Sequence, residues 1–368
     1  MTRRRKLKLS LSMTLGAFFV WELVARGLGV GDCQPPVPAT GSWPEMQADA
    51  RYLWRLTPGY VIRSGDGSTT TVGPLGLRDT FVPHAKAANE VRILTTGDSS
   101  VYGWGVPDGR TYQEDLERRL QGQFPQLRIE VINLGIPGYS TVQTLRLLED
   151  VGFALEPDLL IVSNIFSDCN IDAFQDKKAL ALVSPPTGGL AATLRASRTY
   201  CSAWNVYANH YATSNQERNR VLMPGVPRDT RWLERIDEYV DLSRVPLDDY
   251  LDNIAEIQAQ ATAHGAKMML APLAQEWDVG RWTIRGLPKP KPGQVLPWAP
   301  YREALAAYAI KANVPHVPFY EAFASVPAER QGRLFNDPIH PSVDGAAVMA
   351  ATLYDALMAR PELVTGGP

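Results

Sequence analysis

Three side chains whose types could together perform nucleophilic catalysis stand in two distant segments of this 368-residue chain. The first, Ser99, stands in "ILTTGDSSVYGWG", where an apolar and β-branched run leads straight into Gly-Asp-Ser-Ser. Gly, Asp and Ser are ordinary turn residues, so the turn alone does not establish a reactive serine. A serine hydroxyl becomes a nucleophile when a general base takes its proton and a third group orients that base. The chemistry therefore requires a histidine and an acid elsewhere in the chain.

The histidines narrow the choice of base. The chain has five of them: His84, His210, His264, His316 and His340. His340 lies in "NDPIHPSVDG", and Asp337 stands three residues before it, so one turn can aim both side chains into one cleft. The other four fall in the N-terminal region, in a polar insertion, at the end of a surface helix and at the start of the last strand. We therefore predict a triad of Ser99, Asp337 and His340.

From residue 90 onward, apolar strands alternate with amphipathic helices, and these elements must position the triad. Five strands are expected, at 90–97, 128–135, 157–164, 266–273 and 316–319. Helices are expected at 111–124, 141–155, 246–265, 301–314 and 342–360. Such an alternation predicts an α/β fold in which helices cover both faces of a five-stranded parallel sheet, giving three layers, α/β/α. Ligands bind such sheets at the carboxyl ends of the strands, where Ser99 and His340 both fall.

The remaining segments suggest how the chain is divided. The N-terminus has five basic residues among the first eight, followed by an apolar stretch, which favours an uncleaved membrane anchor with the rest of the chain outside the cytoplasm. A buried helix of the globular domain is the alternative. The expected divisions are 1–33 as basic N-terminus and anchor, 34–89 as linker and small strand-and-turn region, 90–360 as the catalytic domain with an insertion at about 170–245, and 361–368 as a tail.

Composition excludes some classes of function. Hydrophobic residues make up 45% and charged residues 21% of the chain, and the net charge of −2 gives no strong field for binding nucleic acid. The three cysteines show no C-x-x-C spacing that would indicate a metal site. Cys169 and Cys201 either pair in an oxidising compartment or remain two free thiols.

Several segments resemble the conserved blocks of the SGNH or GDSL-type hydrolases. "TTGDSSVYGWG" resembles their first block, "NLGIPGYST" their second and "DPIHPS" their last, while "GLRDTFVP" is similar to the lead-in of membrane-anchored bacterial members. The resemblance covers roughly residues 70 to 360, interrupted by the insertion. It implies a flavodoxin-like sheet, Ser99 as nucleophile, His340 as base and Asp337 as its orienting acid. It also implies an oxyanion hole that includes the backbone N–H groups of Ser99 and Gly138.

The third block departs from that family. After "PDLLIV" the family pattern is G-x-N-D, whose Asn side chain is the remaining oxyanion donor. Aligning "PDLLIVSNIFSD" without gaps places Asp168 on the Asp and Ser167 on the Asn. We predict Ser167 as the replacement donor, with Asn164 or Asn170 as alternatives. Losing one such donor typically costs on the order of 10²–10³ in rate.

Other residues near the predicted strand ends have simpler interpretations. Gly135 and Gly138 fit a strand-to-helix turn whether or not they take part in catalysis. Glu276 and Trp277 either line the pocket or pack their loop. The aromatic residues of the insertion are more typical of a core than of a lid: Trp204, Tyr207 and Tyr211.

Together these features predict a serine esterase or acyl hydrolase. It would act outside the cytoplasm on an ester-linked acyl group of a glycan or lipid, through an acyl-enzyme. The base and the oxyanion donors are protein groups, so no cofactor or metal is expected. The expected partners are a small-molecule, glycan or lipid ester and, through the N-terminal segment, a membrane. One alternative is an O-acyltransferase of the same fold that passes the acyl group to a sugar hydroxyl, and the other is a catalytically silent binding module.

Overall fold

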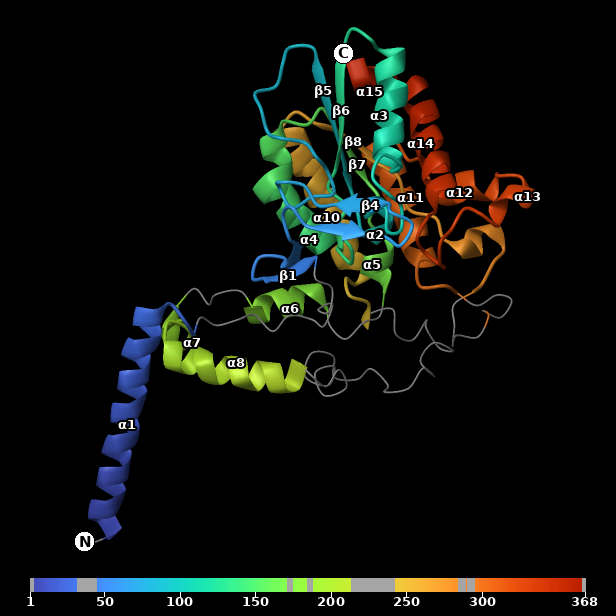
Figure 1. Cartoon of the computed structure of the whole chain (residues 1–368). Helices are drawn as coiled ribbons and strands as arrows, with labels where there is room; N and C mark the ends of the chain where they lie inside the picture. Colours follow the sequence, from blue (N-terminus) through green and yellow to red (C-terminus); the bar gives the residue numbers. More distant parts are fainter. Residues whose placement is uncertain are drawn as a thin grey trace.

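The computed structural model describes residues 3–31, 45–170, 175–183, 188–212, 242–283, 289 and 295–365. A four-stranded parallel sheet forms its centre, in the order β6-β5-β7-β8 (Figure 1). The strands are β5 (Glu90–Thr96), β6 (Arg128–Asn133), β7 (Leu159–Val162) and β8 (Lys267–Leu270). All residues of β5 and β7 are buried, as expected of strands covered on both faces.

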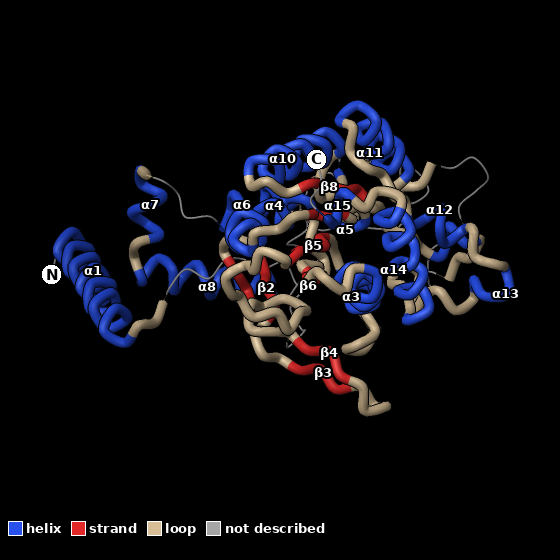
Figure 2. The backbone as a smooth tube through the Cα atoms, turned by 90° about the horizontal axis from the view of Figure 1, so that it is seen from above, coloured by secondary structure: helices blue, strands red, loops and turns tan. Residues whose placement is uncertain are grey.

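Helices lie on both faces of the sheet. Figure 2 shows α3 and α14 on one side of the strands and α4 and α10 on the other. Side-chain caps define several of these helices; for example, Thr111 and Glu114 form a capping box at the start of α3. The helices that follow the strands, including single turns, are α2 (Ser99–Tyr102), α3 (Tyr112–Gln123), α4 (Thr141–Leu147), η1 (Leu148–Gly152), η2 (Phe153–Leu155), α5 (Phe166–Cys169), α10 (Leu247–Ala263), η4 (Glu276–Val279), α11 (Ala299–Ala312), α12 (Phe319–Ala324), α13 (Ala328–Gln331), α14 (Val343–Met358) and α15 (Glu362–Thr365). The predicted α/β/α fold class is confirmed.

The predicted fifth strand at 316–319 is wrong in its extent. His316 forms a single parallel bridge with Leu270 at the end of β8, and Val317 donates its N–H to the Leu270 carbonyl at 2.8 Å. Pro315 and Pro318 flank these two residues, and neither has an N–H to donate to a strand ladder. Pairing therefore stops after one bridge.

Two short hairpins precede the sheet, within the region expected to hold small strands and turns. They consist of β1 (Met46–Asp49) with β2 (Leu53–Leu56), and β3 (Val61–Arg63) with β4 (Thr69–Thr71). Three residues of β2 are buried: Leu53, Trp54 and Leu56. The β1–β2 hairpin thus packs onto the catalytic domain and is more than a linker.

The N-terminal segment forms one long helix, α1 (Arg3–Leu28), which extends away from the rest of the chain (Figure 1). It contacts the insertion, where Glu22 accepts hydrogen bonds from the backbone N–H groups of Arg198 and Thr199 at 3.1 and 2.9 Å. In the ranges that the structure describes, no helix combines the length and apolarity required to cross a membrane. The membrane anchor stays a prediction.

The described parts of the insertion include three helices: α6 (Asp176–Val183), α7 (Gly189–Arg195) and α8 (Arg198–Ala212). The Trp204 side chain is half-buried, whereas the side chains of Tyr207 and Tyr211 lie outside the described part. Cys169 carries a free, buried thiol and Cys201 is disulfide-bonded. These two cysteines therefore do not pair with each other, nor are they two free thiols.

Candidate active site

Ser99 is the first residue of α2, directly beyond the carboxyl end of the central strand β5. Asp98 caps this short helix by accepting a hydrogen bond from the Ser100 N–H at 2.9 Å. The turn also depends on Gly97, because a Cβ there would lie 2.4 Å from Cγ2 of Val101. The sequence thus holds the Ser99 side chain at the edge of the sheet where this fold binds its ligands.

The structure brings Ser99, His340 and Asp337 together. Nε2 of His340 lies 2.7 Å from the Ser99 hydroxyl, and Nδ1 lies 2.6 Å from Oδ2 of Asp337. The other carboxylate oxygen accepts the backbone N–H groups of Ile339 and His340 at 3.0 and 2.9 Å. Burial opposes ionisation of Asp337, but these hydrogen bonds outweigh it and hold the pKa of the carboxyl below its ordinary value. The site therefore presents His340 with an ionised acceptor on one side and a hydroxyl on the other.

The two adjacent serines have different surroundings. Ser100 is buried and donates its hydroxyl to the Ile339 carbonyl at 2.9 Å, while the partly exposed Ser99 faces the imidazole. This hydrogen bond from Ser100 links the turn after β5 to the loop that carries Asp337 and His340. Glu276 holds the same loop from another side, because its N–H donates to the Pro338 carbonyl at 2.9 Å.

The two backbone N–H groups that were predicted as oxyanion donors belong to Ser99 and Gly138. Within the described ranges, neither the Ser99 N–H nor the Gly138 N–H donates to a protein acceptor. Gly138 has φ +78°, a left-handed conformation that glycine adopts without strain. Gly135 allows the same loop to approach α2, since a Cβ there would lie 2.4 Å from the backbone nitrogen of Tyr102.

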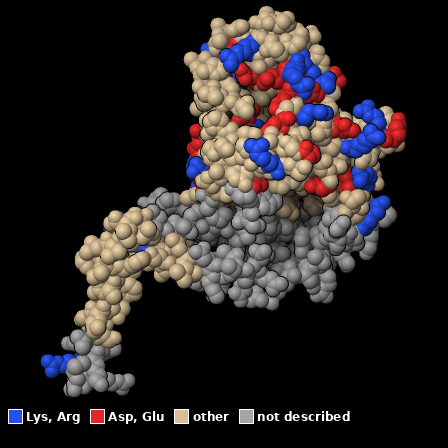
Figure 3. Space-filling view, in the orientation of Figure 1, with Lys and Arg blue, Asp and Glu red and all other residues tan. Residues whose placement is uncertain are grey.

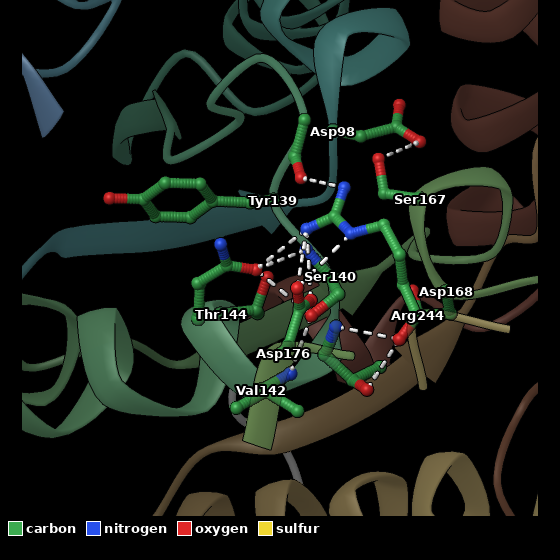
Figure 4. A network of polar contacts seen from close by, with 12 residues as sticks. Asp98, Tyr139, Ser140, Val142, Thr144, Ser167, Asp168, Asp176 and Arg244 are labelled. Atoms are coloured by element: carbon green, nitrogen blue, oxygen red, sulfur yellow. Dashed lines mark hydrogen bonds and ion pairs between the residues drawn. The ribbon is translucent and has the colours of Figure 1, made fainter. Parts of the chain in front are cut away.

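Ser167, the predicted third donor, lies in the first turn of α5 with its hydroxyl 3.4 Å from Oδ2 of Asp98. Figure 4 shows these two side chains facing each other. Asp98 is buried, and that burial raises its pKa. A hydrogen bond at 3.4 Å is long, so the Ser167 hydroxyl keeps only a weak partner within the protein.

The alternative donors are placed differently. Asn164 is buried and donates its side-chain amide to Thr144 Oγ1 at 3.0 Å and to the Tyr139 carbonyl at 3.4 Å. Asn170 is exposed at the end of α5. Asp168, aligned with the family Asp, accepts both the N–H and the hydroxyl of Thr141, at 2.8 and 2.6 Å. Burial raises the pKa of Asp168 to about 7, against the opposing effect of those bonds.

The other described histidines have partners away from Ser99. His84 hydrogen-bonds Glu90 at 3.1 Å, His264 stacks on Phe153 with ring centroids 4.5 Å apart, and His316 lies beside β8. His210 has a side chain outside the described part of the chain. Only His340, of the described imidazoles, is hydrogen-bonded to a serine hydroxyl.

The structure adds three site neighbours to which the sequence pattern assigned no role: Trp104, which lies in the first block, and Trp54 and Arg244, which lie outside every block. The indole ring of Trp104 lies 6.0 Å from the His340 ring, between centroids, and borders the catalytic histidine candidate. Trp54 and Arg244 contact the loop that carries Gly138. Trp277, expected either to line the pocket or to pack its loop, packs edge-on against Trp282 at 5.5 Å.

Comparisons with known proteins identify the family of this chain. The family of GDSL-like lipases and acylhydrolases matches residues 95–348, well over half of the chain. None of the curated proteins matches the chain. The fold is similar to that of a GDSL-like lipase from Bacteroides thetaiotaomicron, at 17% identity over 76% of this chain and 93% of that one, with a TM-score of 0.42.

Two further solved structures are similar to the chain at the same level. One is a variant of an acetyl-xylooligosaccharide esterase from Geobacillus stearmophilus, with 16% identity over 74% of this chain and 95% of that one, and a TM-score of 0.43. The other is an alpha/beta hydrolase enzyme from a Lake Arreo metagenome, with 16% identity, 74% and 95% coverage and a TM-score of 0.43.

Proposed function

This chain belongs to the GDSL-like lipase/acylhydrolase family of ester-bond hydrolases, and from that premise we propose that Ser99, His340 and Asp337 perform its reaction. One observation carries the proposal: His340 bridges the Ser99 hydroxyl and the Asp337 carboxylate at 2.7 and 2.6 Å. A base within hydrogen-bond reach of the nucleophile, itself oriented by an acid, is the geometry that serine acyl transfer requires.

In the proposed reaction, Ser99 Oγ attacks the ester carbonyl carbon while its proton moves to Nε2 of His340. Asp337 accepts the hydrogen bond from Nδ1 and stabilises the imidazolium that forms. The N–H groups of Ser99 and Gly138, with the Ser167 hydroxyl as the proposed third donor, stabilise the oxyanion. The imidazolium then protonates the leaving alcohol, leaving an acyl-enzyme. Water then attacks the acyl carbon and gives a proton to Nε2 of His340, and His340 passes this proton to Ser99 Oγ as the bond between Ser99 and the acyl carbon breaks, releasing the carboxylic acid.

We further propose that the substrate is an ester-linked acyl group of a glycan or lipid, met outside the cytoplasm, with α1 keeping the protein at a membrane. The disulfide at Cys201 supports an oxidising compartment. Large apolar side chains of α1 are exposed, among them Phe18 at 53% and Phe19 at 65%. Figure 3 shows the middle of this segment as mostly uncharged on the visible face, with a basic residue at its tip, in contrast to the mixed charges of the catalytic part.

The test is turnover of 4-nitrophenyl esters of increasing acyl length by the full-length protein. We expect hydrolysis that is abolished in Ser99→Ala and unchanged in Ser325→Ala, whose serine is exposed at the end of α12. Acyl transfer to added sugar hydroxyls in preference to water would favour the O-acyltransferase. Absence of any Ser99-dependent turnover would contradict the proposal and favour the silent binding module.

A further inference from the structure

Gly138 stands at a point where the backbone has unusual freedom. Its φ is +78°, and glycine populates positive and negative φ about equally, so the residue itself does not fix how its peptide planes face. An oxyanion donor is useful only if its N–H points at the position of the developing charge before the reaction begins. Something outside the glycine must therefore fix its two peptide planes.

Trp54 fixes the first of these planes. Its indole N–H donates to the Pro137 carbonyl at 3.0 Å, and that carbonyl shares a rigid peptide plane with the Gly138 N–H. The indole is itself held, because Trp54 is only 1% exposed and the Tyr139 hydroxyl donates to its carbonyl at 2.7 Å. A Cβ on Gly138 would lie 3.0 Å from Cζ2 of the same ring, so the indole also covers this face of the loop.

Arg244 fixes the second plane. Its Nη1 donates to the Gly138 carbonyl at 2.7 Å. Asp176 holds the guanidinium through Nε and Nη2 at 3.1 and 2.9 Å, and both side chains are almost fully buried. In Figure 4 the Arg244 guanidinium points toward Asp176, and dashed lines join the two side chains. The guanidinium carbon also lies 5.6 Å from the centre of the Trp54 ring.

We propose that Trp54 and Arg244 are positioning residues that orient the Gly138 N–H for the oxyanion. This inference rests on the proposed function. Trp54 comes from the β1–β2 hairpin, and Arg244 comes from the end of the insertion, outside every block that resembles the family. Two segments peripheral to the sheet thereby complete the site, which gives the insertion a role in catalysis.

A purely structural role and a positioning role of Trp54 and Arg244 can be told apart by comparing the unfolding temperature with kcat. If they only stabilise the loop, their replacement lowers the unfolding temperature and leaves kcat of the folded protein unchanged. If they orient a donor that acts mainly in the transition state, kcat falls while KM changes little. The apparent pKa values of the pH–rate profile stay the same, since neither residue contacts His340.

The variants are Arg244→Lys, which keeps the charge but not the planar fork, and Trp54→Phe, which keeps a ring but not the N–H. Arg92→Lys is the matched control. Arg92 is equally buried, pairs with Glu90 at 2.6 Å and donates to the Leu155 carbonyl at 2.8 Å, but it lies at the opposite end of β5 from Ser99. Each protein is assayed at full length with 4-nitrophenyl acetate for kcat and KM, and by thermal unfolding.

We expect kcat to fall about 10- to 100-fold in both site variants, less than the 10²–10³ that loss of a donor costs, with KM changed less than about threefold. Weaker inhibition by phenylboronic acid, by a similar factor, should accompany the loss. In Arg92→Lys, kcat should stay within about twofold of the parent even if its unfolding temperature drops. If one of the two site variants does not fold, kcat and KM of the other one test the inference.

The inference is overturned if the parent hydrolyses the ester through Ser99 and the folded site variants behave as Arg92→Lys does. Loss of Ser99-dependent turnover in the parent itself would instead overturn the proposed function. The two failures are distinguishable because the first leaves an active parent enzyme and the second does not.

Discussion

Replacing Asp337 by Asn tests how the carboxylate controls His340. Both carboxylate oxygens of Asp337 act as hydrogen-bond acceptors. One oxygen lies 2.6 Å from Nδ1 of His340, and the other accepts the backbone N–H groups of Ile339 and His340 at 3.0 and 2.9 Å. An asparagine has one acceptor oxygen and one NH₂ group, so one side must bring donor against donor.

The orientation of the new side-chain amide that has the lower free energy is the one that leaves His340 unable to act as the base. If the amide oxygen faces the imidazole, two backbone bonds are lost, at about 1 kcal/mol each. If it keeps those two bonds, the NH₂ faces Nδ1 and the imidazole proton moves to Nε2, which then cannot accept from Ser99. The difference of roughly 2 kcal/mol reduces the productive form about 30-fold. The imidazolium also loses the negative charge that stabilises it, so we expect kcat to fall by about 10⁴-fold in total.

The assay compares kcat for 4-nitrophenyl acetate in the parent, Asp337→Asn and Asp344→Asn. Asp344 is an exposed aspartate in the first turn of α14 and serves as the control that changes charge alone. The Asp337 side chain is 40% exposed, so thermal unfolding of the variant should stay close to that of the parent. A loss in kcat below about 10-fold in a folded Asp337→Asn protein would refute the tautomer argument.

Three further predictions concern other parts of the molecule. Ser167→Ala should lower kcat on the order of 10²-fold and Ser167→Asn should restore part of it; if neither variant changes turnover, Ser167 is not an oxyanion donor. Burial raises the pKa of Glu117 from 4.5 to about 7, so the folded state holds this proton more tightly and the free energy of unfolding should fall as pH rises from about 4.5 to 7. Glu117→Gln should flatten that decline in urea unfolding at pH 5 and 8, and an unchanged decline would contradict the assignment. The full-length protein should stay with membranes after a carbonate wash, whereas release in soluble form would contradict the anchor.

The central sheet and the meeting of Ser99 with His340 were predictable because both depend on local patterns. Continuous apolar runs predict buried parallel strands, and turn residues at their carboxyl ends meet at one edge of the sheet. The fifth strand was overpredicted because two prolines remove the N–H groups that a ladder needs, although the apolar pattern around His316 is that of a strand.

The contributions of Trp54 and Arg244 could not be predicted, since neither lies in a motif with a spacing that implies contact. Trp54 is more than 80 residues from the carbonyl it binds, and Arg244 more than 100. Such pairings are decided by tertiary packing and leave no periodic signal. The Asp98 contact of Ser167 is similar, because it depends on how α5 docks against the turn after β5.

Whether Ser99 is an activated nucleophile is tested most directly by labelling the full-length protein with a fluorophosphonate, followed by peptide mapping. This reagent reports an activated serine without any choice of substrate. We expect a single adduct on Ser99, absent in Ser99→Ala and formed much more slowly in His340→Ala. A folded protein that forms no adduct, or forms it on Ser100, would contradict the assignment of Ser99 as the nucleophile.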